Sequence, residues 1–134
     1  MSDIEELKNK FLVDTEKYDR ARLEDQLKVI LHYCVVDRKG RVIFQRPNLI
    51  NTDKVLLALI SRYLAHQLDD SIPSEVSYKE ISEFLNISPP QARARISDVM
   101  KSNFVKRVKS GKYIIIPYKI DSFLEYLVKR YRNG

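Results

Sequence analysis

The run Ser88-Pro89-Pro90 fixes a point in the chain at which one helix has ended and another begins. A serine hydroxyl accepts hydrogen bonds from the free amides of a helix N-terminus, and prolines in the first turn lose no helical hydrogen bond. The turn at residues 86–88 ends a shorter helix that is predicted over residues 78–85. The sequence therefore predicts two helices joined by a tight turn, with the second helix starting at Pro89.

Apolar residues recur at helical spacing in both segments. They occupy one side of each predicted helix, which indicates a face that packs in a core. In the first helix these residues are Ile81, Phe84 and Leu85, and in the second they are Ala92, Ile96, Val99 and Met100. The other side of the second helix is polar and mostly basic, and it carries Gln91, Arg93, Arg95, Asp98 and Lys101.

A β-hairpin is predicted directly after the second helix. Residues 104–109 mix β-forming residues with cations, Ser110-Gly111 is a turn, and residues 112–117 return as a second strand. Asn103 tolerates the left-handed backbone that ends a helix. Residues 75–77 are a candidate short strand that would pair with this hairpin.

The segment from residue 76 to residue 117 resembles the winged helix-turn-helix domains of bacterial and archaeal transcription regulators, particularly the small archaeal ones. The run EISEFLNISPPQARARISDVMKSNFV, residues 80–105, carries the resemblance. It is similar to their usual order of helix, turn, recognition helix and first wing strand. One departure is Asn103, which stands where many such proteins have glycine.

This resemblance implies a regulator that binds double-stranded DNA. The helix from Pro89 would enter the major groove, and the 104–117 hairpin would be a wing that lies along phosphates. The expected base-contacting residues are Gln91, Arg93 and Arg95, because arginine pairs with guanine and glutamine with adenine. The expected phosphate contacts are Ser88, Lys101, Lys106, Arg107, Lys109 and Lys112.

A second interpretation is a winged-helix module that docks onto proteins in a transcription, replication or repair assembly. The first 51 residues support it, because they resemble no family and offer a possible protein-binding extension. A solvated basic surface without a ligand is the simplest reading of the same cations.

Composition agrees with an anionic partner. The net charge of the 134 residues is +6, and 44% of them are hydrophobic, which indicates a folded basic protein.

The single cysteine, Cys34, lies among apolar residues, so we expect a buried thiol, a reducing compartment and a cytoplasmic protein. His32 and His66 are far apart and no catalytic motif is present. We expect no enzyme activity, no metal, no cofactor and no membrane-spanning segment.

The rest of the chain predicts further helices. A short helix from Ser2 to about residue 11 or 13 precedes a longer one from about residue 15 or 16 toward Cys34. Residues 29–45 are also compatible with a strand-turn-strand hairpin around the turn at residues 37–40. Thr52 is the predicted cap of a helix over residues 53–68, and Asp121 or Ser122 is the predicted cap of a last amphipathic helix.

These elements predict a mainly α fold with a small β-hairpin, in the α+β class. Residues 1–51 form a helical extension, residues 52–118 the winged helix-turn-helix domain, and residues 119–134 a C-terminal helix. The apolar sides of the terminal helices pack either in the core or in a subunit interface. We expect a two-fold homodimer, because such helices often meet in a second subunit.

Overall fold

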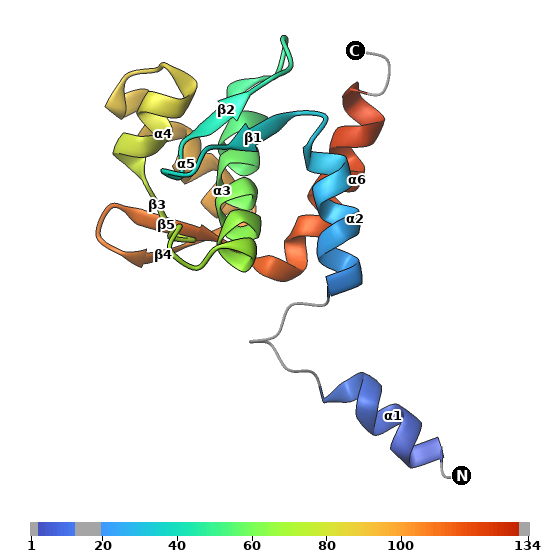
Figure 1. Cartoon of the computed structure of the whole chain (residues 1–134). Coiled ribbons are helices and arrows are strands. Elements are labelled where there is room, and N and C mark those ends of the chain that lie inside the picture. Colours follow the sequence, from blue (N-terminus) through green and yellow to red (C-terminus); the bar gives the residue numbers. More distant parts are fainter. Residues whose placement is uncertain (1–2, 13–19, 132–134) are drawn as a thin grey trace.

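The computed structural model describes residues 3–12 and 20–131, and it shows an α+β fold that is mostly helical (Figure 1). The helices in these residues are α1 (Asp3–Phe11), α2 (Arg20–Ile30), α3 (Asn51–Leu68), α4 (Tyr78–Leu85), α5 (Pro89–Lys101) and α6 (Ile120–Tyr131), with a short 3-10 helix η1 (Pro117–Lys119). The strands are β1 (Cys34–Val36), β2 (Val42–Phe44), β3 (Val76–Ser77), β4 (Val105–Lys109) and β5 (Lys112–Ile115).

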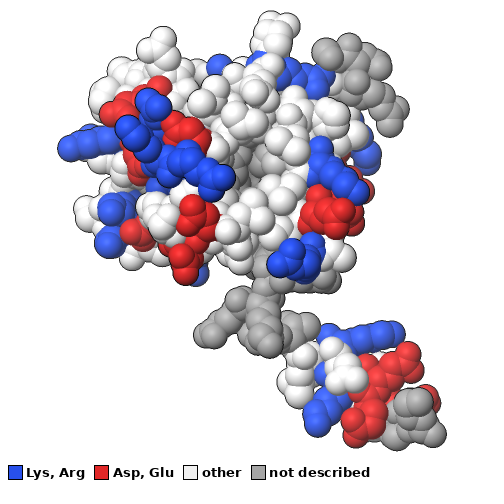
Figure 2. All heavy atoms as spheres, viewed as in Figure 1, with Lys and Arg blue, Asp and Glu red and all other residues white. Residues whose placement is uncertain are grey.

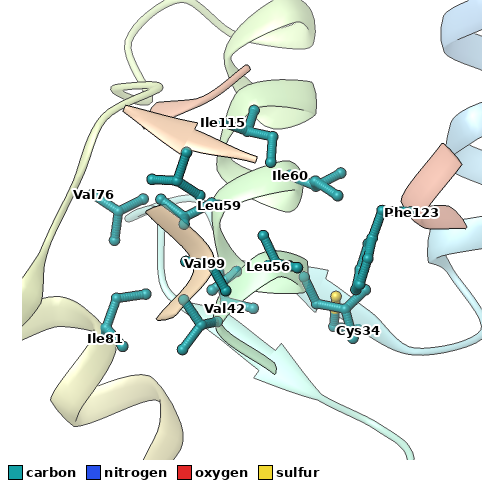
Figure 3. Packing of buried hydrophobic residues seen from close by; sticks show 14 of the residues in the cluster. Cys34, Val42, Leu56, Leu59, Ile60, Val76, Ile81, Val99, Ile115 and Phe123 are labelled. Atoms are coloured by element: carbon teal, nitrogen blue, oxygen red, sulfur yellow. The ribbon is translucent and has the colours of Figure 1, made fainter. Parts of the chain in front are cut away.

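Helix α3 is the centre of the fold. It contacts α2, α4, α5 and the strands β1, β2 and β5. Because elements surround it, residues from Val55 to Ile60 are all at most 4% exposed, although a surface helix would bury only one side. Figure 3 shows Leu56, Leu59 and Ile60 of α3 among side chains from the other elements. One core therefore joins the N-terminal region to the elements that follow α3.

The two helices predicted on either side of residues 86–88 are confirmed. Helix α4 spans the predicted residues, α5 begins at Pro89, and each starts with a capping box. Ser77 and Glu80 form the first box, and Ser88 and Gln91 form the second. Local hydrogen bonds within each box set the helix starts, and this is why the sequence alone located them.

The predicted hairpin and its extra strand are also confirmed. Strands β4 and β5 are antiparallel, and β3 pairs with the other edge of β5, so the sheet order is β3-β5-β4. Asn103 adopts the expected left-handed backbone, with φ 63°. This positive φ lets the chain leave α5 and enter β4 within four residues.

The preferred prediction for residues 29–45, a helix continuing toward Cys34, is wrong, and the alternative hairpin is present. Helix α2 ends at Ile30, and β1 and β2 pair with Cys34 opposite Phe44. The turn between them is stabilised by Asp37, whose carboxylate accepts hydrogen bonds from the amides of Lys39 and Arg41. Gly40 supplies the positive φ of 88° that this turn requires. The predicted start of α2, at residue 15 or 16, lies outside the described residues.

Two predicted helix caps are also wrong. Helix α3 begins at Asn51, so Thr52 lies inside it, and its N-cap residue Ile50 makes no side-chain cap. Helix α6 begins at Ile120, directly after η1, so Asp121 and Ser122 lie in its first turn. Asp121 instead binds α2, because its carboxylate accepts hydrogen bonds from Arg22 at 2.7 Å and Gln26 at 2.6 Å.

Helix α6 packs on its own chain. Ile120, Phe123, Leu124 and Leu127 are buried, whereas Val128 is 40% exposed. Helix α1, by contrast, has no buried residue. The homodimer remains a prediction. No helix in the described residues is both long and apolar enough to cross a membrane.

Candidate nucleic-acid interface

A cationic hollow lies where the start of α4, the first half of α5 and the β4–β5 turn meet. Its volume is about 540 Å³. Four basic side chains line it, and no acidic side chain does: Lys79, Arg93, Arg107 and Lys112. Tyr78 and Tyr113 complete its wall, together with small turn residues. Four like charges around one concave surface attract an anion strongly, because the nearby protein limits screening by water.

Arg93 is held in this hollow by Tyr78. The guanidinium carbon of Arg93 lies 4.1 Å from the centre of the Tyr78 ring, which is a close cation–π contact. The backbone amide of Tyr78 donates a hydrogen bond to the carbonyl of Gly111 at 3.1 Å. Gly111 has a φ of 73°, and a Cβ at this position would come within 3.4 Å of the Tyr78 ring. The turn of the hairpin, the start of α4 and Arg93 are therefore fixed relative to one another.

The cations of β4 lie on both faces of the sheet. Arg107 pairs with Tyr113 and Lys106 pairs with Ile114 in the register of the sheet. Adjacent strand residues point to opposite faces, so Arg107 lines the hollow while Lys106 lies on the other face. The alternation of the strand thus brings one of these two predicted phosphate contacts into the hollow.

Glu75 partly neutralises the hairpin. Its carboxylate lies 3.6 Å from the Lys109 ammonium and 3.7 Å from the Lys112 ammonium. The Lys109 side chain is 63% exposed and that of Lys112 is 44% exposed, so these ion pairs are weak and can open when a stronger anion arrives. The acid lies just before β3.

The remaining predicted residues are distributed along α5. Ser88 and Gln91 are exposed at its start but bind each other in the capping box. Arg95 Nε lies 3.3 Å from the Asp98 carboxylate. Because each residue of an α-helix is rotated by about 100° from the one before it, Arg95 lies about 200° around the helix from Arg93. Lys101 is exposed and shares a second, smaller hollow with Arg93 and Tyr113. The structure therefore groups Lys101 with Arg93 and leaves Arg95 apart.

The sequence prediction missed Lys79 and Tyr78 as site residues. Both belong to the first turn of α4, which the predicted pairing of residues 75–77 with the hairpin brings beside the wing. That pairing was the available signal, because it places the residues that follow β3 next to β5.

Outside the hollow, the buried Nε of Arg95 has no hydrogen-bond partner among the described residues, whereas Cys34 and His66 have partners. Cys34 Sγ lies 3.0 Å from Ser61 Oγ, and burial raises the pKa of the thiol to about 11. His66 Nδ1 lies 2.8 Å from the carbonyl oxygen of Ile72. Among residues 3–12 and 20–131 no three His, Cys, Asp or Glu side chains gather as metal ligands would.

Comparison of the chain with models of protein families, with curated proteins and with solved structures gives no match.

Proposed function

We propose that residues 52–118 are a winged helix-turn-helix domain that binds duplex DNA, most simply as a transcription regulator. The order of elements supports this proposal, since α3, α4 and α5 are followed by a two-stranded hairpin whose inner strand also pairs with β3. The observation that carries it is the cationic hollow. Its four cations come from α4, α5 and the hairpin, and these three elements face a duplex together when such a domain binds.

In the proposed complex α5 enters the major groove and the hairpin lies along the phosphates. Arg93 contacts a base edge. Before DNA binds, the Tyr78 ring restricts the conformations of the Arg93 side chain. Arg107, Lys112 and Lys79 bind phosphates at the hollow, and Lys101 and Lys109 extend this contact. Lys106, on the other face of the sheet, does not take part. Gln91 lies at the exposed start of α5 and reaches a base after exchanging Ser88, its partner in the capping box, for DNA. Arg95, which lies about 200° around the helix from Arg93 and beside Asp98, stays outside this contact.

Binding affinity measured against salt concentration tests this function. Arg107→Ala should weaken binding to every duplex about equally, and it should reduce the slope of log Kobs against log salt by about 1. Arg93→Ala should weaken a preferred duplex by about 1–3 kcal/mol and a random duplex by less. Lys39→Ala, an equal charge change on the exposed β1–β2 turn, is the matched control. Equal effects of Arg107→Ala and Lys39→Ala would contradict the proposal.

The alternative is a winged-helix protein-interaction module. One observation favours it: large apolar side chains remain exposed in the N-terminal region, among them Phe11 at 84% and Leu31 at 58%. In that case the chain would bind DNA only through non-specific attraction between its net positive charge and the phosphates. Arg93→Ala would then lower DNA affinity no more than Lys39→Ala does.

A further inference from the structure

An apolar groove runs between α2, β1 and the second half of α3. Its volume is about 440 Å³, and Leu27, Leu31, Leu64 and Leu68 are among the residues that line it. Leu31 is 58% exposed and Leu68 is 63% exposed. Figure 2 shows an uncharged hollow on this face between margins that carry charges. Leucines this exposed around one concave surface indicate a surface that another apolar element covers.

Helix α1 carries an exposed apolar side. Ile4, Leu7 and Phe11 recur at helical spacing on one side, and they are 68%, 60% and 84% exposed. The other side is charged, and Lys10 lies 3.9 Å from Glu6 there. An isolated helix of nine residues is only marginally stable in water. The stability of α1 therefore depends on a surface that covers its apolar side.

We propose that α1 of a second copy of this chain packs in the groove, and that the exchange is reciprocal, so that two copies form a two-fold dimer. A single copy leaves both the groove and the apolar side of α1 bare, and α1 stands apart from the rest of its own chain in Figure 1. Reciprocal packing covers two helices and two grooves with one symmetric contact. It makes no use of the cationic hollow.

The lengths of the two surfaces match. Helix α1 has nine residues and α2 has eleven, so α1 can run along most of α2 at about 1.5 Å per residue. The charges at the β1 end of the groove are mixed, because Asp37 and Asp69 lie there with Arg38. The match therefore rests on length and on the apolar surfaces, and these charges do not set the direction of α1.

Sedimentation velocity of the full chain over a range of concentrations tests the dimer without DNA. We expect Leu68→Lys and Leu7→Asp each to raise the dimer dissociation constant about tenfold or more, since a buried leucine contributes about that much. Both side chains are exposed in a single copy, so neither change should disturb the fold. Ile43→Lys, on the β1–β2 hairpin and 49% exposed, should leave the dimer unchanged. A monomer at all concentrations, or a dimer unaffected by both groove changes, would overturn the proposal.

Cross-linking identifies which copy supplies α1. Copies carrying Leu7→Cys are mixed with copies carrying Leu68→Cys and oxidised, and we expect disulfide-linked pairs of one copy of each kind. Glu6→Cys, on the charged side of α1, should link much less. Cys34 is buried and should not compete. If the doubly substituted chain instead closes its disulfide internally and sediments as a monomer, α1 covers its own groove and the proposal fails.

Discussion

Arg62 of α3 and Glu80 of α4 form a charged hydrogen bond in which Nη1 lies 2.5 Å from Oε2. Arg62 is only 2% exposed, and it also donates to the carbonyl oxygens of Gly40, Pro73 and Glu75. One buried side chain thus joins the β1–β2 turn, the loop before β3 and the start of α4. The N-terminal hairpin and the proposed DNA-binding elements share this anchor.

Replacing Arg62 by methionine should destabilise the fold by about 3–5 kcal/mol, because three carbonyl groups and a carboxylate lose their partner. The free energy of unfolding, measured by urea denaturation, reports this loss. Lys39→Met, at an exposed turn position, should change it by less than about 0.5 kcal/mol. A loss below about 1 kcal/mol for Arg62→Met would mean that the carbonyl groups find water or other donors.

The buried thiol of Cys34 predicts a pH dependence of stability. Its pKa is about 11 in the folded chain against 9.0 for a free thiol, so between these values the unfolded chain has lost a proton that the folded chain keeps. The free energy of unfolding should therefore fall as pH rises from 9 to 11, and the contribution is complete below pH 9.

Cys34→Ser is the matched variant, since a hydroxyl retains the contact with Ser61 but does not ionise in this range. Its stability should fall less steeply than that of the wild type between pH 9 and 11, as measured by urea denaturation at each pH. Burial also raises the pKa of Tyr33, but this tyrosine is common to both chains and cancels in the difference. Parallel pH profiles would show that the thiol ionises as readily in the folded chain as in the unfolded one.

The Tyr78 ring should contribute to DNA affinity through Arg93. Tyr78→Ala removes the cation–π contact and frees the guanidinium, so we expect about two- to fivefold weaker binding to a preferred duplex. Tyr78→Phe keeps the ring and should bind within about twofold of the wild type. Fluorescence anisotropy gives both affinities, and circular dichroism checks that the variants are folded. A folded Tyr78→Ala variant with unchanged affinity would remove Tyr78 from the site.

Glu75 should oppose DNA binding. Glu75→Gln removes a negative charge beside the hairpin and releases Lys109 and Lys112, so affinity for any duplex should rise a few-fold at low salt. Glu24→Gln is the control, because Glu24 also pairs with a lysine, Lys28 at 3.5 Å, but lies on α2. If both changes raise affinity alike, only the net charge matters.

Features that depend on residues close together in the sequence were predicted correctly, whereas features that depend on distant residues were not. The end of α4 and the start of α5 were predicted from Ser88 and its prolines, because the residues that cap a helix lie within a few positions of its end. The hairpin followed from its β-forming and turn residues, and its third strand followed from the resemblance to winged-helix domains, in which a short strand commonly pairs with the wing. The residues around Cys34 were ambiguous, because a run such as LKVILHYCVV suits a helix or a strand, and only packing against α3 decides between them.

Contacts between distant residues were not predicted. Asp53, at the start of α3, is buried and accepts a 2.6 Å hydrogen bond from the Tyr131 hydroxyl, 78 positions later. The network around Arg62 and the contact of Tyr78 with Arg93 are of the same kind. In the candidate site, the sequence predicted the basic elements, but only the fold shows that Arg93, Arg107 and Lys112 meet with Lys79 and that Arg95 lies apart.

Selection from a randomised duplex pool, at a low and a moderate salt concentration, tests DNA recognition most directly. The wild-type chain should enrich a defined motif, which would be palindromic if the protein binds as a two-fold dimer. Affinity should fall steeply with salt, and the Arg93→Ala variant should lose preference at one base position of the motif. Absence of binding even at low salt would contradict a DNA-binding function and favour the protein-interaction module.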